Sequence, residues 1–406
     1  MKRRSVPEGL RDITWAMVYV LLKGFRATLL ASSISVLASG CTFYTSCPSG
    51  SPSNDNQGGS NAGGAGNGGG MSIPTGEWQN ASGNLAGIPS ECGNMSALAT
   101  KPDVDLLIAG IAQKGLWSSI DGGGSWQALG TGEGSDTITN RMRNIVFDPD
   151  APDHWWEGGI YNGGGVYETT DDGRTFNVLG DDSQRGDLLS VDLSDPDRNT
   201  LLIGGHESAG ALTLSRDGGQ TWGPLGEGLP DDSNCTFPLI LDTQTFLVGC
   251  GGYGETSTGI YRSTNGGKSW KQVSNMGVAG APLRASDGTL YWVGTDGTLT
   301  RSEDDGVNWV DAIGGGTLVG PNVIELPDGR LAGLAKQYVL VSSDQGASWV
   351  DASSALPYSE AAPASGLVYS KEQKAFFIWH FSCGFDGPVP VPDDAIMRYD
   401  FDYEAS

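Results

Sequence analysis

Residues 119–126 read SIDGGGSW: a serine, an aspartate two places later, three glycines in a row and a closing tryptophan. The same eight-residue frame recurs as TTDDGRTF (169–176), SRDGGQTW (215–222), STNGGKSW (263–270), SEDDGVNW (302–309) and SSDQGASW (342–349). The closing aromatic residues are spaced by 50, 46, 48, 39 and 40 positions. A period of this size over short apolar segments of β type predicts a propeller or a solenoid.

Each position of the frame has a physical role in a turn. The oxygen at the third position can accept hydrogen bonds from its own turn, and the glycine at the fifth position suits a positive φ. The third-position residues are Asp121, Asp171, Asp217, Asn265, Asp304 and Asp344. The closing aromatic residues, which we expect to pack between neighbouring sheets, are Trp126, Phe176, Trp222, Trp270, Trp309 and Trp349. A phosphate-binding loop needs a following Gly-Lys-Ser/Thr, which SIDGGGSW lacks. Because all six copies share one turn frame, we interpret them as structural turns.

The frame S-x-D-x-G-x-[ST]-W resembles the Asp-box, or BNR, motif. The chain is therefore similar, over roughly residues 77–402, to the Asp-box β-propellers. That set includes sialidases, xyloglucanase-type glycoside hydrolases, sortilin-type receptors and photosystem II assembly lipoproteins of cyanobacteria. The resemblance is specific for architecture and says little about activity.

The segments around the frames predict the number of blades. Six units each place three short apolar segments before the frame and one after it. After the sixth frame, three further strands are expected at GLVYS (366–370), AFFIWHF (375–381) and AIMRYDF (395–401), and EWQNAS (77–82) precedes the first unit. We therefore predict an all-β, seven-bladed β-propeller over residues 73–406, whose N-terminal strand completes the last blade. Closure of this kind removes exposed edge strands.

Charge excludes one class of partner. The chain carries 24 Lys and Arg against 48 Asp and Glu, which gives a formal net charge of −24. Because such a surface repels phosphate backbones, we exclude nucleic acid as a ligand. The acidic clusters do not have the spacing of a calcium-binding EF-hand loop, and no cofactor fingerprint is present. We expect no cofactor and no metal, and we expect a monomer.

The first 72 residues predict export and anchoring. Residues 1–40 combine basic residues with the short apolar run ATLLASSISVLAS (27–39), which is typical of a signal peptide rather than of a membrane span. The run ends in LASGC, which resembles the lipobox of bacterial lipoproteins and implies lipidation of Cys41. Residues 41–72 are rich in Gly, Ser and Asn and predict a flexible tether. We expect a lipid-anchored protein of the bacterial cell envelope, with the outer membrane as its site; ordinary secretion is the alternative, and Met17 is an alternative start.

The remaining cysteines fit the blade layout. Cys235 begins the first strand of the fourth blade and Cys250 ends its antiparallel neighbour. Cys92 precedes the first blade, and Cys383 follows the second strand of the last one. We predict disulfides between Cys235 and Cys250 and between Cys92 and Cys383, with free buried thiols as the alternative.

Function is expected at the rim opposite the six turns, where the longer loops lie. The candidate ligand-binding residues there are Arg141, Tyr161, Asp181, Arg185, His206, Glu207, Lys336, Tyr338, Tyr358, Phe385 and Asp386. The Arg-Ile-Pro motif that the sialidase resemblance implies is absent. We predict a membrane-anchored propeller that binds a glycan or a protein through this rim. A polysaccharide-active hydrolase or lyase, acting through carboxylates in the central depression, is the alternative, and whether the chain is an enzyme is left open.

Overall fold

The computed structural model describes residues 76–404, except 133, 182–184, 207–211, 233, 252–257, 313–317, 320–322, 360–361 and 384–386. The predicted signal segment, tether and lipidation site at Cys41 lie outside these residues. Within them the chain forms strands and two short 3-10 helices, η1 (Gly83–Leu85) and η2 (Gly134–Thr137). No helix in this part of the chain is both long and apolar enough to cross a membrane.

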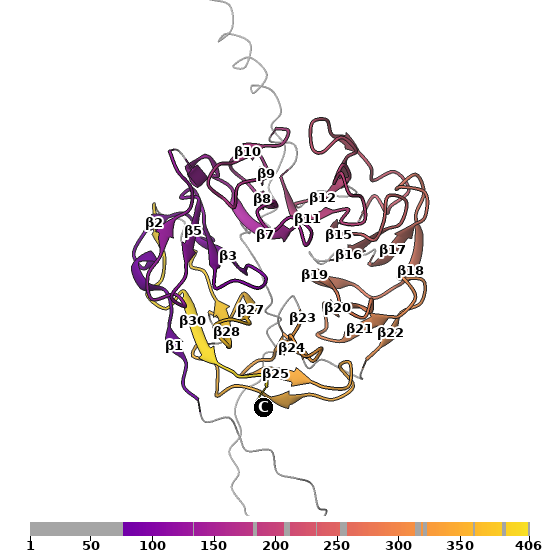
Figure 1. The fold of residues 1–406 in the computed structure, drawn as a ribbon. Coiled ribbons are helices and arrows are strands. Elements are labelled where there is room, and N and C mark those ends of the chain that lie inside the picture. The colour runs from indigo at the N-terminus through magenta and orange to yellow at the C-terminus, as the bar shows by residue number, and fades with distance from the viewer. Residues whose placement is uncertain are drawn as a thin grey trace, which may run out of the picture. The chain divides into compact units, whose positions relative to one another are not determined.

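Seven four-stranded antiparallel sheets are arranged around a centre (Figure 1). The first three, each from its inner to its outer strand, are β3 (Met95–Thr100), β4 (Leu107–Ile111), β5 (Leu116–Ser119) and β6 (Gln127–Ala128); β7 (Arg141–Phe147), β8 (Trp155–Ile160), β9 (Val166–Thr169) and β10 (Asn177–Val178); and β11 (Gly186–Val191), β12 (Leu201–Gly205), β13 (Leu212–Ser215) and β14 (Gly223–Pro224).

The next three sheets repeat this order. They are β15 (Cys235–Ile240), β16 (Phe246–Cys250), β17 (Gly259–Ser263) and β18 (Lys271–Ser274); β19 (Val278–Arg284), β20 (Leu290–Gly294), β21 (Leu299–Ser302) and β22 (Val310–Asp311); and β23 (Val323–Glu325), β24 (Leu331–Leu334), β25 (Val339–Ser342) and β26 (Val350–Asp351). In all six sheets the frame joins the third strand to the fourth, as predicted from the sequence.

The seventh sheet closes the ring with both ends of the domain. It contains β27 (Gly366–Ser370), β28 (Ala375–Trp379), β30 (Ile396–Asp400) and β1 (Gln79–Asn80), and β1 pairs with β30 through Gln79 opposite Arg398. The inner strands of neighbouring blades contact one another around the whole circle, including β27 with β3. The prediction of a seven-bladed β-propeller closed by its N-terminal strand is confirmed.

The first frame shows how the turns are held. The Asp121 carboxylate accepts hydrogen bonds from Ser119 Oγ at 2.8 Å, from Ser125 N at 2.9 Å and from Ser125 Oγ at 2.7 Å. These bonds, those from Ser125 first, lower the pKa of Asp121 to about 2. Gly123 has φ of 89°, and a Cβ there would lie 2.5 Å from the Ala81 carbonyl oxygen, so only glycine fits.

The same network recurs in the other five frames. In the fourth, Asn265 replaces the aspartate; its Oδ1 accepts from Ser269 N at 3.0 Å, and its Nδ2 donates to Ser269 Oγ at 2.8 Å. An amide therefore makes the same turn as a carboxylate. The six frames are a repeated structural device, and their polar groups are occupied within the turns.

The core lies between the sheets, and β8 shows why the strands are apolar on both sides. Trp155 packs with the cluster shared with blade 1, whereas Trp156 packs with the cluster shared with blade 3, and each is 1% exposed. Successive side chains of a strand point to opposite faces of its sheet. Each blade is therefore covered on both faces by its neighbours.

Both predicted disulfides are present. Cys235 and Cys250 lie opposite each other in the first strand pair of blade 4. The Cys92–Cys383 bridge joins the segment before blade 1 to the loop after β28 of blade 7, across the point where the ring closes.

Candidate functional site

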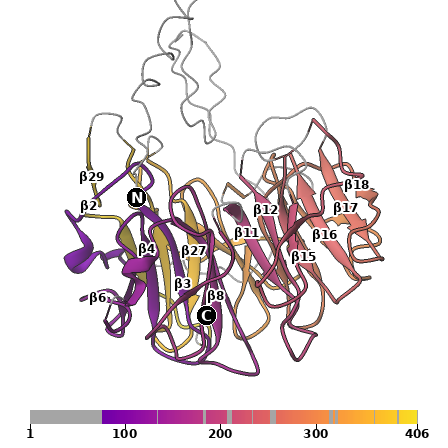
Figure 2. The ribbon, with the colours of Figure 1, turned by 90° about the horizontal axis from the view of Figure 1, so that it is seen from above.

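The connections between blades meet at the rim opposite the six turns. Because each sheet is antiparallel, the loops between its second and third strands and the links to the next blade lie at the same end. The short pair β2 (Pro89–Ser90) and β29 (Val389–Pro390) stands at this end, beyond the blade strands in Figure 2. This end carries the interactions described next.

A group of polar and aromatic side chains from blades 1 to 3 meets at this rim. It consists of Glu91, Arg141, Tyr161, Asp187 and His206, and we call it the Tyr161 cluster. Arg141 begins the inner strand of blade 2, Asp187 lies on the inner strand of blade 3, and Tyr161 and His206 each follow the second strand of their blade. Five separate segments thus contribute one side chain each.

Tyr161, His206 and Asp187 form a hydrogen-bonded chain. His206 Nδ1 lies 2.9 Å from Asp187 Oδ1, and His206 Nε2 lies 2.8 Å from Tyr161 Oη. Asp187 is 2% exposed, and an ionised carboxylate only accepts hydrogen bonds, so Nδ1 is the donor. Nε2 of a neutral imidazole is then the acceptor for the Tyr161 hydroxyl.

Arg141 links this chain to Glu91. Its guanidinium carbon lies 4.5 Å from the centre of the Tyr161 ring, and its Nε donates to Glu91 Oε1 at 3.1 Å. Glu91 also accepts from Asn162 Nδ2 at 3.1 Å and from Gln113 Nε2 at 2.7 Å. Glu91 therefore orients the arginine that covers the tyrosine ring.

The Cys92–Cys383 disulfide holds this segment, since Cys92 directly follows Glu91. Gly93 comes next, with φ of 75°, and a Cβ at this position would lie 3.0 Å from Arg141 Nη1. The absence of a side chain at residue 93 therefore leaves space for the guanidinium.

Tyr161 has an unusual backbone for its residue type. Its φ is 65°, in the left-handed region that costs a bulky residue free energy, and its side chain is 38% exposed. It opens the sequence YNGGG (161–165), the loop between the second and third strands of blade 2. Strained residues of this kind cluster at ligand sites, where the surrounding contacts hold them in place.

Two further arginines lie beside the cluster. Arg143 Nε is 3.5 Å from Asp187 Oδ1 and has no hydrogen-bond partner. Arg185 Nε donates to the Gly163 carbonyl oxygen at 3.0 Å. Three arginines thus lie on neighbouring segments, and two of them are ion-paired within the cluster: Arg141 with Glu91 and Arg143 with Asp187.

A buried acid lies on the second strand of the same blade. Glu157 on β8 has no exposure, and its Oε2 accepts a hydrogen bond from Asn140 Nδ2 at 3.1 Å, while Oε1 has no partner. Burial raises the pKa of Glu157 to about 8, so the side chain is protonated at neutral pH. Asn140 directly precedes Arg141 in the chain.

The structure brings some predicted site residues together and separates others. Arg141, Tyr161 and His206 meet, with Arg185 beside them. Asp181 is exposed on the link between blades 2 and 3, whereas Lys336 and Tyr338 lie on the loop of blade 6. Glu207, Phe385 and Asp386 lie outside the described residues.

Tyr358 has a structural environment. Its hydroxyl donates to the Asp394 carbonyl oxygen at 3.0 Å, and its ring packs against His380, 4.5 Å between centroids. Burial raises the pKa of Tyr358. Its hydroxyl is thus used within the fold of blade 7.

Sequence reasoning missed several members of the site. Asp187 and Glu91 were not among the candidates, nor was Asn162. Asp187 could have been found as the acidic residue in the apolar inner strand GDLLSV (186–191). Nothing local marked Glu91 beyond its position next to a bridging cysteine.

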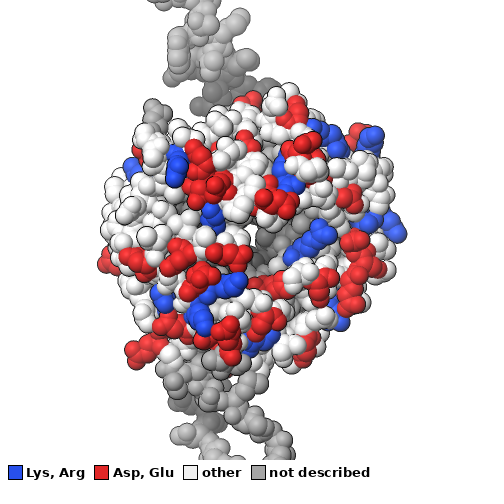
Figure 3. Space-filling model, in the orientation of Figure 1, with Lys and Arg blue, Asp and Glu red and all other residues white. Residues whose placement is uncertain are grey.

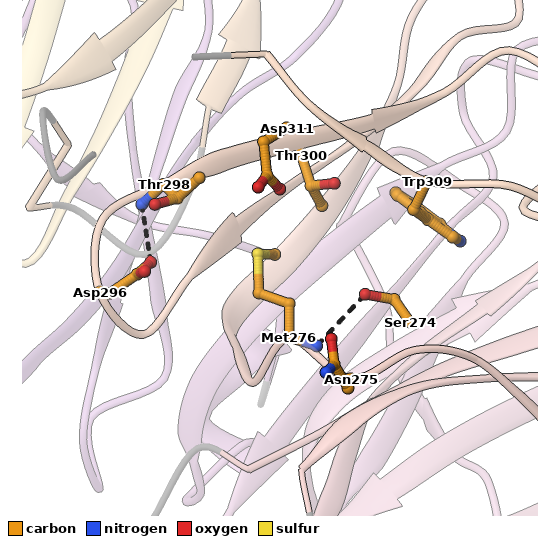
Figure 4. A pocket seen from close by; sticks show the side chains of 8 residues that line it. All are labelled: Ser274, Asn275, Met276, Asp296, Thr298, Thr300, Trp309 and Asp311. Carbon is orange, nitrogen blue, oxygen red and sulfur yellow. Dashed lines mark hydrogen bonds between the residues drawn. The ribbon is translucent and has the colours of Figure 1, made fainter. Parts of the chain in front are cut away.

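A separate pocket of about 370 Å³ lies between blades 4 and 5 (Figure 4). It is lined by Ser274, Asn275, Met276, Asp296, Thr298, Thr300, Trp309 and Asp311. The pocket contains two carboxylates, those of Asp296 and Asp311. The Asp296 carboxylate is held in place, because its Oδ1 accepts a hydrogen bond from Thr298 N at 2.9 Å. The hydroxyl and carboxylate oxygens of the pocket can hydrogen-bond a small polar ligand.

Acidic side chains predominate on the face that Figure 3 shows, with Lys and Arg scattered among them. Across the described residues, no group of three or more His, Cys, Asp or Glu is arranged to hold a metal ion.

The chain resembles known β-propellers. The family model described as the DUF6242 beta propeller domain matches residues 239–378. The oligoxyloglucan-reducing end-specific xyloglucanase of Emericella nidulans is 28% identical over 226 residues, which are 47% of this chain and 26% of the enzyme. The match thus spans about a quarter of that relative's length.

Two solved structures are similar to the chain. An ancestral GH74 enzyme aligns over 81% of this chain and 46% of its own, with a TM-score of 0.50 and 15% identity. YCF48 from Cyanidioschyzon merolae aligns over 80% and 98%, with a TM-score of 0.49 and 13% identity. At 15% identity the likeness to the GH74 enzyme is one of fold, and the class that the fold defines is the β-propeller.

Proposed function

We propose that this β-propeller binds a glycan at the Tyr161 cluster. The observation that carries the proposal is the half-exposed Tyr161 ring, held in a strained backbone between the Arg141 guanidinium and the His206 imidazole. Ligand sites combine an apolar or aromatic surface with a few placed polar groups, and this cluster has both. Sequence similarity to part of a xyloglucanase supports a carbohydrate over a protein ligand.

A glycan array with the purified protein tests this proposal. We expect binding to a restricted set of glycans that Tyr161→Ala abolishes. Lys336→Ala is the matched control, because Lys336 is exposed on the same rim but belongs to blade 6. Equal loss in both variants, or binding that survives Tyr161→Ala, would contradict the assignment.

The protein acts outside the cytoplasm in this proposal. Two disulfides are typical of proteins that fold in an oxidising compartment. The Asp-box resemblance and the cysteine of LASGC support an envelope lipoprotein whose tether presents the propeller. Lipid attachment predicts that Cys41→Ser releases the protein from membranes. Membrane fractionation tests this, and an unchanged membrane association would contradict anchoring at Cys41.

A further inference from the structure

We propose that the Tyr161 cluster cleaves glycans that contain uronate residues, by β-elimination, with Tyr161 as the proton-transferring residue. The inference rests on the proposed glycan binding and adds a reaction and a substrate class to it. It is carried by the geometry of Tyr161, His206 and Asp187 and by the arginines beside them.

The hydrogen-bonded chain is arranged to move a proton from Tyr161. Asp187 accepts from His206 Nδ1 at 2.9 Å, which leaves Nε2, 2.8 Å from Tyr161 Oη, with its lone pair toward the phenol. When the phenol proton passes to Nε2, the buried carboxylate stabilises the imidazolium. A carboxylate that fixes the tautomer of a histidine, which in turn activates a hydroxyl, is a general device for proton transfer.

The phenol is placed to meet a substrate. Tyr161 is 38% exposed, and the guanidinium of Arg141 lies over its ring, 4.5 Å from the ring centre. The strained φ of 65° shows that surrounding contacts, rather than backbone preference, set this position.

The arginines indicate the substrate class. Arg141 uses Nε to bind Glu91, and neither of its Nη groups donates a hydrogen bond to a described residue. Arg143 adds a second guanidinium, whose Nε lies 3.5 Å from Asp187 Oδ1 and makes no hydrogen bond. A guanidinium binds a carboxylate through paired N–H groups, so the carboxylate of a uronate suits this position beside the phenol.

The β-elimination needs no oxidant, reductant or water. Tyr161 passes its proton to His206 Nε2, and the phenolate oxygen removes the proton from C5 of the uronate. The arginines stabilise the negative charge that develops on the carboxylate. The electron pair of the C–H bond becomes a C4=C5 double bond as the C4–O bond breaks. Tyr161 gives the C5 proton to the leaving oxygen, and His206 returns the phenol proton.

The experiment incubates the purified protein with polygalacturonate, alginate and hyaluronan, with xyloglucan as the neutral control. The unsaturated uronate product is followed by its ultraviolet absorbance, and binding is measured by calorimetry in parallel. We expect absorbance to grow with at least one uronate polymer and not with xyloglucan. Tyr161→Phe should lower kcat by about 100-fold or more with little change in KM. Tyr261→Phe, which removes a hydroxyl from the third strand of blade 4, should leave the rate unchanged.

The other outcomes distinguish the proposed glycan binding from the proposed elimination reaction. Binding of a uronate polymer without product, or turnover that survives Tyr161→Phe, overturns the elimination reaction and leaves glycan binding standing. Binding of xyloglucan alone overturns the uronate class. Failure to bind any glycan overturns the proposed function and this inference together. Circular dichroism of Tyr161→Phe shows whether a loss of rate reflects misfolding.

Discussion

Replacing the buried acid of blade 2 has a calculable effect on stability. Glu157 is fully buried with a pKa of about 8, against an ordinary value of 4.5. Between these values the folded chain binds a proton that the unfolded chain has released, so wild-type stability falls as pH rises from about 4.5 to about 8. One pKa unit is about 1.4 kcal/mol, so at pH 7 the penalty is on the order of 3 kcal/mol.

Glu157→Gln removes this titration with almost no change in shape. The amide oxygen still accepts from Asn140 Nδ2, and the new N–H group can meet Asn140 Oδ1, which has no partner in the wild type. We expect the free energy of unfolding to rise by about 2–3 kcal/mol at pH 7, with the gain vanishing near pH 4.5.

Urea unfolding of both proteins at several pH values measures this difference. Other titrating groups are common to the two proteins and cancel. A difference between the variant and the wild type that does not change with pH would refute the reasoning, because it would mean that Glu157 is not protonated in the folded state at neutral pH.

Two further predictions concern the turns and the site. Asp121→Ala should lower the free energy of unfolding by about 1–2 kcal/mol through lost turn hydrogen bonds and leave ligand affinity unchanged. Urea unfolding and calorimetry test this. A variant that is as stable as the wild type but has lost binding would contradict the structural role. Gly93→Ala should weaken ligand binding, because its Cβ would displace Arg141. Gly132→Ala is the control, since Gly132 also has positive φ but no neighbour within 4 Å, and equal affinity of the two variants would count against a role for Arg141.

The fold could be predicted because its signal is repeated. The distances between the six copies of the frame indicate the length of each blade. Each copy also contains the side chains that hydrogen-bond within its own turn. Ring closure could be predicted because the segments from GLVYS (366–370) onward supply only three strands, and EWQNAS (77–82) supplies the fourth strand of that blade. Both disulfides followed from the layout, since strand order alone brings each pair of cysteines to one rim.

The site could be predicted only in part, because its contacts are made between blades. Tyr161 and His206 were found as polar residues on the expected rim. The sequence does not show that the Tyr161 hydroxyl contacts the His206 imidazole, because that contact depends on how blade 2 faces blade 3. Asp187 and Glu157 share a detectable signal: each is an acidic residue within an otherwise apolar strand.

Tyr161→Asn tests the central claim, that the protein maintains Tyr161 in a strained position for ligand binding. Asparagine accepts the left-handed backbone that costs tyrosine about 1–3 kcal/mol, so the variant relieves strain as it removes the ring. The measurement is a calorimetric titration of the wild type and of the variant with a glycan that the wild type binds on the array. Thermal melting is measured on the same samples. We predict a melting temperature equal to or above that of the wild type and an affinity at least about tenfold lower. Full affinity in a protein that melts like the wild type would contradict the account.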